Sequence, residues 1–291
     1  MSPGSATGYL WARNGSKRGT PDRVAGLSLV NQTVPVRAVV CDLDGVVWLS
    51  HREIPGSAAA IARLRGAGAE VLFVTNASFT TVAEVESHLA RIGVPATGQV
   101  LTSAMAAARA VEPGESVLLC GGAGLREELE RRGCRVSVAH EVRGTRDRFD
   151  AVVVGLYREF DYGVLADCMR AVRGGARLIG SNADNSYPTP EGPEPGGGAV
   201  LAAIAVAAGV EPLVTGKPHG PMMELVRARL GGTDPAHTVV IGDKVSTDGL
   251  LAGELGCRFG FVLSGVGDAA EAPAGSVVGR DLASVVDKLL G

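Results

Sequence analysis

The sequence predicts an α/β protein with a doubly wound parallel sheet and a second α/β domain inserted into the first. Short apolar runs alternate with helical stretches over residues 37–93 and 237–265, a rhythm typical of βαβ units with helices on both faces of a parallel sheet. The same rhythm recurs in the middle of the chain, between the turn signals EPG and VEP. We therefore predict a core of residues 35–113 and 212–291, and an inserted domain of residues 114–211.

The expected elements follow in order along the chain. The first part of the core reads as strand RAVVC, helix GSAAAIARLRGAG, strand EVLFVTN and helix TVAEVESHLARIG. The middle reads as strands SVLLCGG, FDAVVVGL and ARLIGSN, and helices LREELERRG, YGVLADCMRAVRGG and GGGAVLAAIAVAAG. The last part reads as strand HTVVIGD, helix STDGLLAGELG, which stops at its glycine, and strand CRFGFVLSG. The stretch rich in proline and glycine at 187–198 precedes a helix and is expected to be an ordered loop.

Composition narrows the class of protein. The 291 residues are 46% apolar with a net charge of -3, so the overall charge gives no reason to expect nucleic acid or an anionic membrane as a partner. The apolar stretch 199–210 is too short to span a bilayer, and we predict no transmembrane helix. Residues 1–34 are rich in Gly, Ser, Pro and Arg and read as a disordered extension, with an organellar presequence as the alternative.

The cysteines indicate a reducing compartment. They are odd in number, widely spread and without a C-x-x-C pair, which argues against a zinc site and against a disulfide framework. We expect reduced core residues in a cytoplasmic protein. They are Cys41, Cys120, Cys134, Cys168 and Cys257.

Polar and charged side chains follow several strands of the predicted core. In a doubly wound sheet the carboxyl ends of the strands are where ligands bind, so we expect these side chains to meet in one crevice. The set comprises Asp42 and Asp44 after RAVVC, Thr75 and Asn76 after EVLFV, Lys217 in TGKPHG, Asp243 after HTVVIG, and Asp248 at the start of the next helix.

This set of residue types indicates phosphoryl transfer. Clustered carboxylates repel one another, so they must take up protons or hold a cation, and hard oxygen ligands suit Mg²⁺. A metal, a lysine and a hydroxyl group form a site that stabilises a phosphoryl group electrostatically. One aspartate at the first strand end can then attack phosphorus, while the other transfers protons to and from the leaving oxygen and water.

Four segments, in this order, resemble the motifs of the haloacid dehalogenase (HAD) superfamily of phosphatases. They are DLDGVVW, VTNAS, GKPHGPMMELV and IGDKVSTDGLLAGELGC, and the middle segment SNADNSYPTPEGPEPGGGAVLAAI resembles the cap of subfamily IIA, the NagD and 4-nitrophenylphosphatase-like group. The resemblance covers roughly residues 36–290. It implies a Rossmann-like core with an inserted α/β cap of type C2, and a small phosphorylated metabolite as substrate. Caps of this type often mediate homodimers in relatives.

The resemblance also implies a role for each site residue. Asp42 would be the nucleophile and Asp44 the general acid and base, and Mg²⁺ would be held by the Asp42 carboxylate, the Asp44 backbone carbonyl and Asp243. Asp248 would hold a metal-bound water or Lys217. Thr75, Asn76 and Lys217 would bind the phosphate, and the cap loop around Asn182 and Asp184 would close over the rest of the substrate.

Several residues have a second interpretation. Asp248 fits the N-cap of the following helix, Thr75 fits a helix cap, and Asn182 and Asp184 suit Asx turns as well as they suit substrate contacts. Cys41 should face the opposite side of its strand and pack in the core. The five histidines show no metal-ligand spacing, and only His219, two residues past Lys217, stands where it could approach the site.

Two positions depart from the pattern of the subfamily: Ala77 replaces an asparagine, and Tyr157 stands where an acidic residue is frequent.

Two other functions use similar residues. A haloacid-type dehalogenase shares the aspartyl nucleophile, but Asp44 favours a phosphoryl leaving group. A phospho-accepting receiver also combines acids, a threonine and a lysine, but receivers are about half this length and lack an inserted domain. NAD and ATP are not supported: Glu127 interrupts the dinucleotide-like CGGAGLREE, and Pro218 replaces the hydroxyl residue of a P-loop in TGKP.

Overall fold

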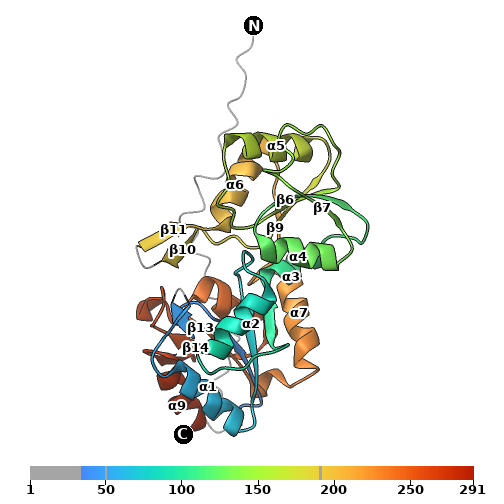
Figure 1. The fold of residues 1–291 in the computed structure, drawn as a ribbon. Helices are drawn as coiled ribbons and strands as arrows, with labels where there is room; N and C mark the ends of the chain where they lie inside the picture. The colour runs from blue at the N-terminus through green and yellow to red at the C-terminus, as the bar shows by residue number, and fades with distance from the viewer. Residues whose placement is uncertain (1–33, 50, 190–191) are drawn as a thin grey trace.

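The structure of the chain is a computed structural model that describes residues 34–49, 51–189 and 192–291. The extension expected at residues 1–34 lies outside the described residues, apart from its last position. Two α/β units lie one above the other, and the chain leaves the lower unit and returns to it (Figure 1). We call the lower unit the core and the upper unit the cap.

The core contains one parallel sheet, as predicted. Strand β1 lies between β13 and β4, and its Val40 is opposite Val240 on one side and Leu72 on the other. From β1 the chain first builds outward to β5 and later, in the opposite direction, to β15, so the strand order reverses beside β1. This reversal is where doubly wound sheets bind ligands. In spatial order the strands are β15 (Val277–Gly279), β14 (Arg258–Val262), β13 (Thr238–Gly242), β1 (Ala38–Cys41), β4 (Glu70–Thr75) and β5 (Val100–Thr102).

Helices cover both faces of this sheet because successive side chains of each buried strand point to opposite faces. Val39 and Cys41 pack with α1 (Ser57–Gly66), α2 (Val82–Arg91) and α9 (Leu282–Leu290). Ala38 and Val40 pack with residues of α3 (Ser103–Arg109), α7 (Gly220–Leu230) and α8 (Leu250–Leu255). Cys41 is therefore a buried core residue, as expected. Among the described helices, none has the length and apolar character that crossing a membrane requires.

The cap has its own parallel sheet and its own apolar core. Its strands, in spatial order, are β12 (Leu213–Val214), β9 (Arg177–Gly180), β8 (Ala151–Val154), β6 (Ser116–Cys120) and β7 (Arg135–Val138). Its helices are α4 (Ala123–Arg131), α5 (Tyr162–Arg173) and α6 (Gly197–Ala208). Strand β12 pairs with β9 beyond the expected border at residue 211, so this sheet extends past the predicted boundary.

The stretch 187–198, expected to be a loop, contributes to a two-stranded antiparallel sheet. Strands β10 (Ser186–Thr189) and β11 (Gly192–Pro195) pair with Pro188 opposite Pro193. Proline lacks an N–H, but both strands of a two-stranded sheet are edge strands, where a missing donor is tolerated. The pair lies at the lower edge of the cap (Figure 1). The remaining short elements are β2 (Trp48–Leu49), β3 (Arg52–Glu53), and 3₁₀ turns at Pro235–His237 and Ala269–Glu271.

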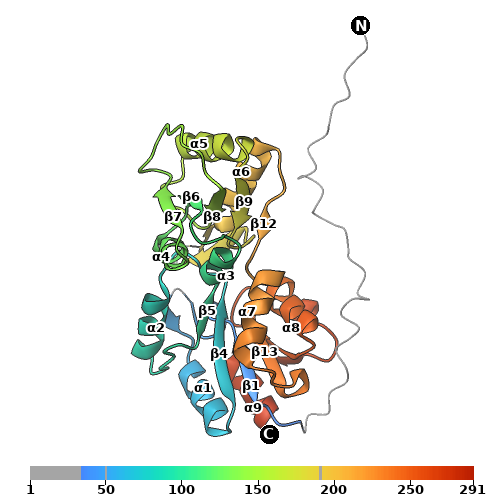
Figure 2. The same ribbon diagram turned by 90° about the vertical axis from the view of Figure 1, so that its right-hand side faces the viewer.

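The cap docks onto the loop that follows β4. Helices α3 and α4 lie side by side at this junction (Figure 2). The N–H of Gly124 donates to the Phe79 carbonyl (2.9 Å), and the N–H of Leu125 donates to the Ser78 carbonyl (3.1 Å). The Ser78 hydroxyl also pairs with that of Ser181 in the cap (2.9 Å). The start of α4 is thus fixed to the same loop that carries polar residues of the predicted site.

This docking requires a glycine at position 124, because an added Cβ would lie 2.2 Å from the Thr80 carbonyl oxygen. We expect Gly124→Ala to lower the free energy of unfolding by about 1–3 kcal/mol, the usual range for overpacking. Gly66→Ala is the matched control: this helical position has nothing within 4 Å of an added Cβ and should gain about 0.5–1 kcal/mol. Urea unfolding measures both. Equal stability of the two variants would contradict the docking contact.

Candidate active site

Three carboxylates distant in sequence meet at the carboxyl end of the core sheet. Asp42 follows β1, Asp243 follows β13, and Asp248 lies in the π-helical turn Val245–Gly249. One carboxylate oxygen from each residue lies within 4.8 Å of the other two. The reversal of strand order beside β1 therefore brings together the acids that the sequence pattern assigned to one crevice.

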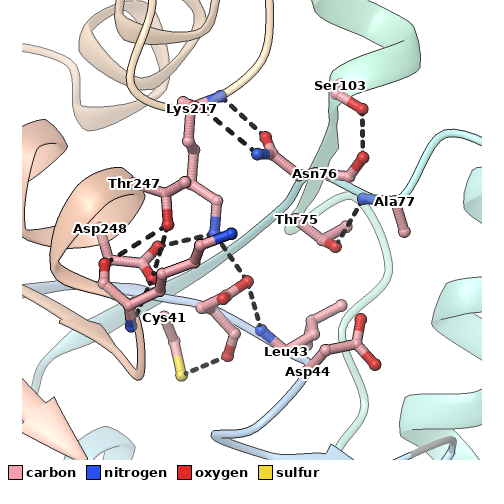
Figure 3. Close-up of polar contacts among 12 residues, drawn as sticks. Cys41, Leu43, Asp44, Thr75, Asn76, Ala77, Ser103, Lys217, Thr247 and Asp248 are labelled. Atoms are coloured by element: carbon pink, nitrogen blue, oxygen red, sulfur yellow. Dashed lines mark hydrogen bonds and ion pairs between the residues drawn. The ribbon is translucent and has the colours of Figure 1, made fainter. Parts of the chain in front are cut away.

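Lys217 joins two of these acids. Its Nζ lies 2.7 Å from Asp42 Oδ1 and 2.7 Å from Asp248 Oδ1, and its side chain is only 2% exposed (Figure 3). Burial by itself lowers the pKa of the ammonium, but the charges of Asp248 and Asp42 outweigh burial and raise the pKa above its ordinary value. Lys217 is therefore charged at neutral pH.

One lysine does not balance the acids around it. Burial raises the pKa of Asp42 well above its ordinary value, although Lys217 opposes the shift. Burial, together with the charge of Asp248, raises the pKa of Asp243 to about 6. Both shifts have the same physical cause: an ionised carboxylate has lost water without gaining enough positive charge. The cluster is thus built to take up a proton or a cation.

The donor set around Asp243 fits Mg²⁺. An added Cβ at Gly45 or at Gly265 would lie 2.4 Å or 1.9 Å from Asp243 Oδ2, so two backbone segments without side chains enclose this oxygen. The N–H of Val266 also donates to it (2.8 Å). The carboxylate is thereby fixed next to the Asp42 and Asp44 segment, and the available ligands are the hard oxygens that Mg²⁺ prefers.

Asp44 has a different environment from Asp42. Its carboxylate points away from Lys217 (Figure 3) and accepts a hydrogen bond from Trp48 Nε1 (3.0 Å). Burial raises the pKa of Asp44, while the Trp48 hydrogen bond and the Lys217 charge partly offset the shift. Two aspartates separated by one residue thus differ in their partners: Asp42 is paired with the Lys217 ammonium, and Asp44 is bound by the Trp48 indole N–H and points away from that ammonium. Such a division suits a nucleophile and a general acid.

Thr75 and Asn76 lie at the end of β4, beside Lys217. The Asn76 side chain accepts from the Lys217 N–H (2.8 Å) and donates to the Lys217 carbonyl (3.2 Å), so it fixes the backbone from which the ammonium extends. Thr75 is 2% exposed, and its hydroxyl accepts from the N–H of Ala77 (3.0 Å). Ala77 therefore takes part in the site through its backbone.

The cap residues Asn182 and Asp184 also contact Asn76, beside Lys217. Asn182 Nδ2 donates to the Asn76 carbonyl (2.8 Å), and Asp184 Oδ2 accepts from Asn76 Nδ2 (2.9 Å). The Asp184 N–H donates to Asn182 Oδ1 (3.1 Å), which forms the Asx turn that the sequence allowed. The cap loop is thus hydrogen-bonded to the core loop beside Lys217.

The structure separates some of the alternatives left open by the sequence. Asp248 is not a helix N-cap, because its carboxylate accepts from Lys217 Nζ and from the Thr247 hydroxyl (3.2 Å) within the π-helical turn. Tyr157 is buried in the cap core, with its hydroxyl against His140 Nδ1. His219 is the N-cap residue of α7 without a side-chain capping hydrogen bond.

Two polar contacts of the site were missed from the sequence. Trp48 holds Asp44, and Lys244 Nζ lies 2.8 Å from Asp184 Oδ1. Both residues stand within the motifs that resemble the HAD superfamily: Trp48 ends DLDGVVW, and Lys244 is the cation between the two acids of IGDKVSTD. A lysine between two site acids was the available signal for the second contact.

Comparisons with known proteins agree with this geometry. Residues 39–135 match the family model described as haloacid dehalogenase-like hydrolase, and residues 214–290 match a second model of HAD-like hydrolases. The chain is 36% identical to D-glycerol 3-phosphate phosphatase of Mycobacterium tuberculosis over 80% of its own length and 65% of that protein. It is 34% identical to the 5'-nucleotidase YutF of Bacillus subtilis, over 75% of its own length and 82% of that relative.

A solved structure gives the same result. The crystal structure of glycerol phosphate phosphatase from Mycobacterium tuberculosis in complex with magnesium superposes with a TM-score of 0.75 at 34% identity, over 86% of this chain and 76% of that one. The motifs, the two-unit fold and the relatives agree. The chain belongs to the haloacid dehalogenase-like hydrolases, within the NagD and 4-nitrophenylphosphatase-like subfamily of phosphatases.

Proposed function

We propose that this chain is a Mg²⁺-dependent phosphomonoesterase that hydrolyses a small phosphorylated metabolite through a phosphoryl group carried on Asp42. Substrates of the glycerol phosphate, phosphoglycolate, sugar phosphate or 4-nitrophenyl phosphate type fit this proposal. The observation that carries it is the position of Asp42, held by Lys217 at 2.7 Å and grouped with Asp243 and Asp248. Two relatives, a D-glycerol 3-phosphate phosphatase and a 5'-nucleotidase, support the substrate class.

Asp42 is oriented for attack by two donors on one oxygen. Lys217 Nζ and the N–H of Leu43 (2.8 Å) both bind Oδ1, and we assign the attack on phosphorus to Oδ2. When the Asp42–phosphorus bond forms, the bond from phosphorus to the ester oxygen breaks, and Asp44 gives its proton to that leaving oxygen. Bound Mg²⁺ would be held by Asp42, Asp243 and the Asp44 carbonyl, and would supply positive charge to the phosphoryl oxygens.

The second half of the reaction reverses the role of Asp44. Now ionised, Asp44 takes a proton from a water molecule, whose oxygen attacks phosphorus. The Asp42–phosphorus bond breaks and phosphate leaves, so both aspartates return to their starting forms. Thr75, Asn76 and Lys217 are assigned to phosphate binding, with the Lys217 charge opposing the negative charge that develops. Asn182 and Asp184 are assigned to the loop that closes over the rest of the substrate.

The cysteines and the net charge bear on the location and the partners of the protein. We propose the cytoplasm, supported by five free and buried cysteines, and we propose that nucleic acid is not a partner, supported by the net charge of -3. We also propose that the chain forms a homodimer through the cap. We assign the dimer contact to exposed Val210, which precedes edge strand β12, and to exposed Leu213, which lies in that strand.

Asp42→Asn should abolish turnover and leave the fold intact, because the amide keeps an oxygen for the Leu43 N–H but is not a nucleophile. We expect kcat to fall by about 10⁴-fold or more, as for other catalytic nucleophiles. Phosphate release from 4-nitrophenyl phosphate and from a metabolite panel measures the loss. Asp287→Asn, at an exposed ion pair with Arg63, is the control that keeps activity. Retained phosphatase activity in Asp42→Asn, or chloride release from 2-haloacids without phosphate release from esters, contradicts the assignment.

Trp48→Phe should move the basic limb of the pH profile to higher pH. The hydrogen bond from Trp48 lowers the pKa of Asp44, so its removal raises that pKa and keeps the acid protonated to higher pH. The kcat/KM of the variant, measured against pH, should fall off later than that of the parent. An unmoved basic limb would show that Asp44 is not the acid that titrates.

Asp243→Asn should change how stability depends on pH and on Mg²⁺. The folded-state pKa of Asp243, about 6, lies above the ordinary value of 3.8, so its contribution to stability is full below pH ~4 and is lost as pH rises through about 6. In EDTA, the free energy of unfolding of the parent should therefore fall more than that of Asp243→Asn as pH rises from about 4 to about 6. The expected difference is up to about 3 kcal/mol, at about 1.36 kcal/mol per pKa unit. Thermal unfolding measures this difference.

The same variant tests the metal site. Mg²⁺ should raise the Tm of the parent at pH 7, because a ligand that binds only the folded state stabilises it. The Tm of Asp243→Asn should stay nearly unchanged. An equal Mg²⁺ response in both proteins would place the ion elsewhere.

A further inference from the structure

The side chain of Lys244 extends from the core toward the cap, and its backbone position is fixed. Its backbone is held by the π-helical turn: its carbonyl accepts from the Asp248 N–H (2.8 Å), and its N–H donates to Asp248 Oδ2 (3.4 Å). Its Nζ lies 2.8 Å from Asp184 Oδ1, with the lysine side chain 39% exposed and the aspartate side chain 22% exposed. The ion pair therefore joins the segment that follows β13 to the cap loop.

This contact closes a ring of hydrogen bonds and ion pairs around the site. Lys244 binds Asp184, whose other oxygen binds the Asn76 side chain. Asn76 binds the backbone of Lys217, the Lys217 ammonium binds Asp248, and Asp248 accepts from the Lys244 N–H. The members are Lys244, Asp184, Asn76, Lys217 and Asp248. Two of them carry the ammonium and carboxylate pair that fixes the proposed nucleophile.

Within this ring, Asp184 contacts both the loop after β4 and the segment after β13. Other hydrogen bonds between cap and core, including those of Asn182 and Ser181, involve residues of the loop after β4, at 76–80. Lys244 instead comes from the segment after β13, on the other side of β1. Without the Lys244 ammonium, the Asp184 carboxylate would keep the Asn76 side chain as its one donor among the described residues.

We propose that Lys244 is a positioning residue that fastens the cap loop of residues 181–186 over the phosphate site through Asp184. This inference rests on the proposed phosphatase function for its kinetic consequence. Lys244 sets the position of the loop that contacts the substrate, so its charge acts mainly on KM and little on the chemical step. A partly exposed pair of this kind is weakened by salt, so the fastening loosens as ionic strength rises.

The kinetic test is a double-mutant cycle on the full chain with 4-nitrophenyl phosphate and Mg²⁺. Lys244→Met should raise KM by about threefold to tenfold, the order expected when a charge-assisted contact is lost, with a smaller change in kcat. Lys244→Arg keeps the charge and should restore most of the loss. In an Asp184→Asn background, Lys244→Met should add little, because its partner is already altered. Lys288→Met is the control and should match the parent, because Lys288 lies in α9 and binds the Val278 carbonyl.

Two kinetic outcomes overturn the proposal. Parental KM in Lys244→Met would show that the ion pair does not hold the loop. Independent, multiplying effects of Lys244→Met and Asp184→Asn would show that Lys244 acts directly on the substrate and not through Asp184.

Hydrogen exchange without substrate separates this proposal from the proposed function. Backbone amides of residues 181–186 should exchange faster in Lys244→Met and in Asp184→Asn than in the parent, and Lys288→Met should match the parent. High salt should speed exchange in the parent toward the Lys244→Met level. If no substrate is hydrolysed, the proposed function fails while this readout still decides the fastening. Equal exchange in the parent and in Lys244→Met overturns the fastening even when phosphatase activity is present.

Discussion

The site depends on the buried ammonium of Lys217 between the carboxylates of Asp42 and Asp248. A buried charge without a partner costs several kcal/mol, so the lysine and the two aspartates hold one another in place. The pairing remains incomplete, because Asp243 adds a third carboxylate within 4.8 Å and, among the residues that the structure describes, Lys217 is the one ammonium bound to the group. Burial, together with this excess of negative charge, raises the pKa of Asp42 and of Asp243, and a divalent cation would balance the cluster. The excess of negative charge that suits the cluster to a cation therefore also lowers the stability of the fold.

The fold makes this cluster possible by reversing its strand order beside β1. Asp42 directly follows strand β1, with Asn76 directly after the neighbouring strand β4 on one side and Asp243 directly after β13 on the other. The cap then contributes Asp184 from above, through a loop tied to both sides. A parallel sheet fully covered by helices provides a rigid base, so residues at its strand ends keep their separation when substrate charge is introduced.

Residues at strand ends could be predicted from the sequence because their position follows from a local pattern. Asp42, Asp243 and Asn76 each follow a short apolar run, and the topology of a doubly wound sheet brings such ends together. Contacts between distant loops could not be predicted in this way. The pairing of Lys244 with Asp184 depends on how the cap sits on the core, which no local pattern encodes. Pro188 and Pro193 likewise concealed an antiparallel pair, because proline argues against strands wherever the sheet continues on both sides.

The central claim, that Asp42 carries the phosphoryl group, can be tested most directly by trapping that group during turnover. Borohydride reduces an aspartyl phosphate to homoserine, and mass spectrometry locates the reduced residue in the peptide that contains residues 38–48. The account predicts homoserine at position 42 only when phosphorylated substrate and Mg²⁺ are both present. Turnover that leaves Asp42 unreduced, or that places the reduced residue at another aspartate, would contradict it.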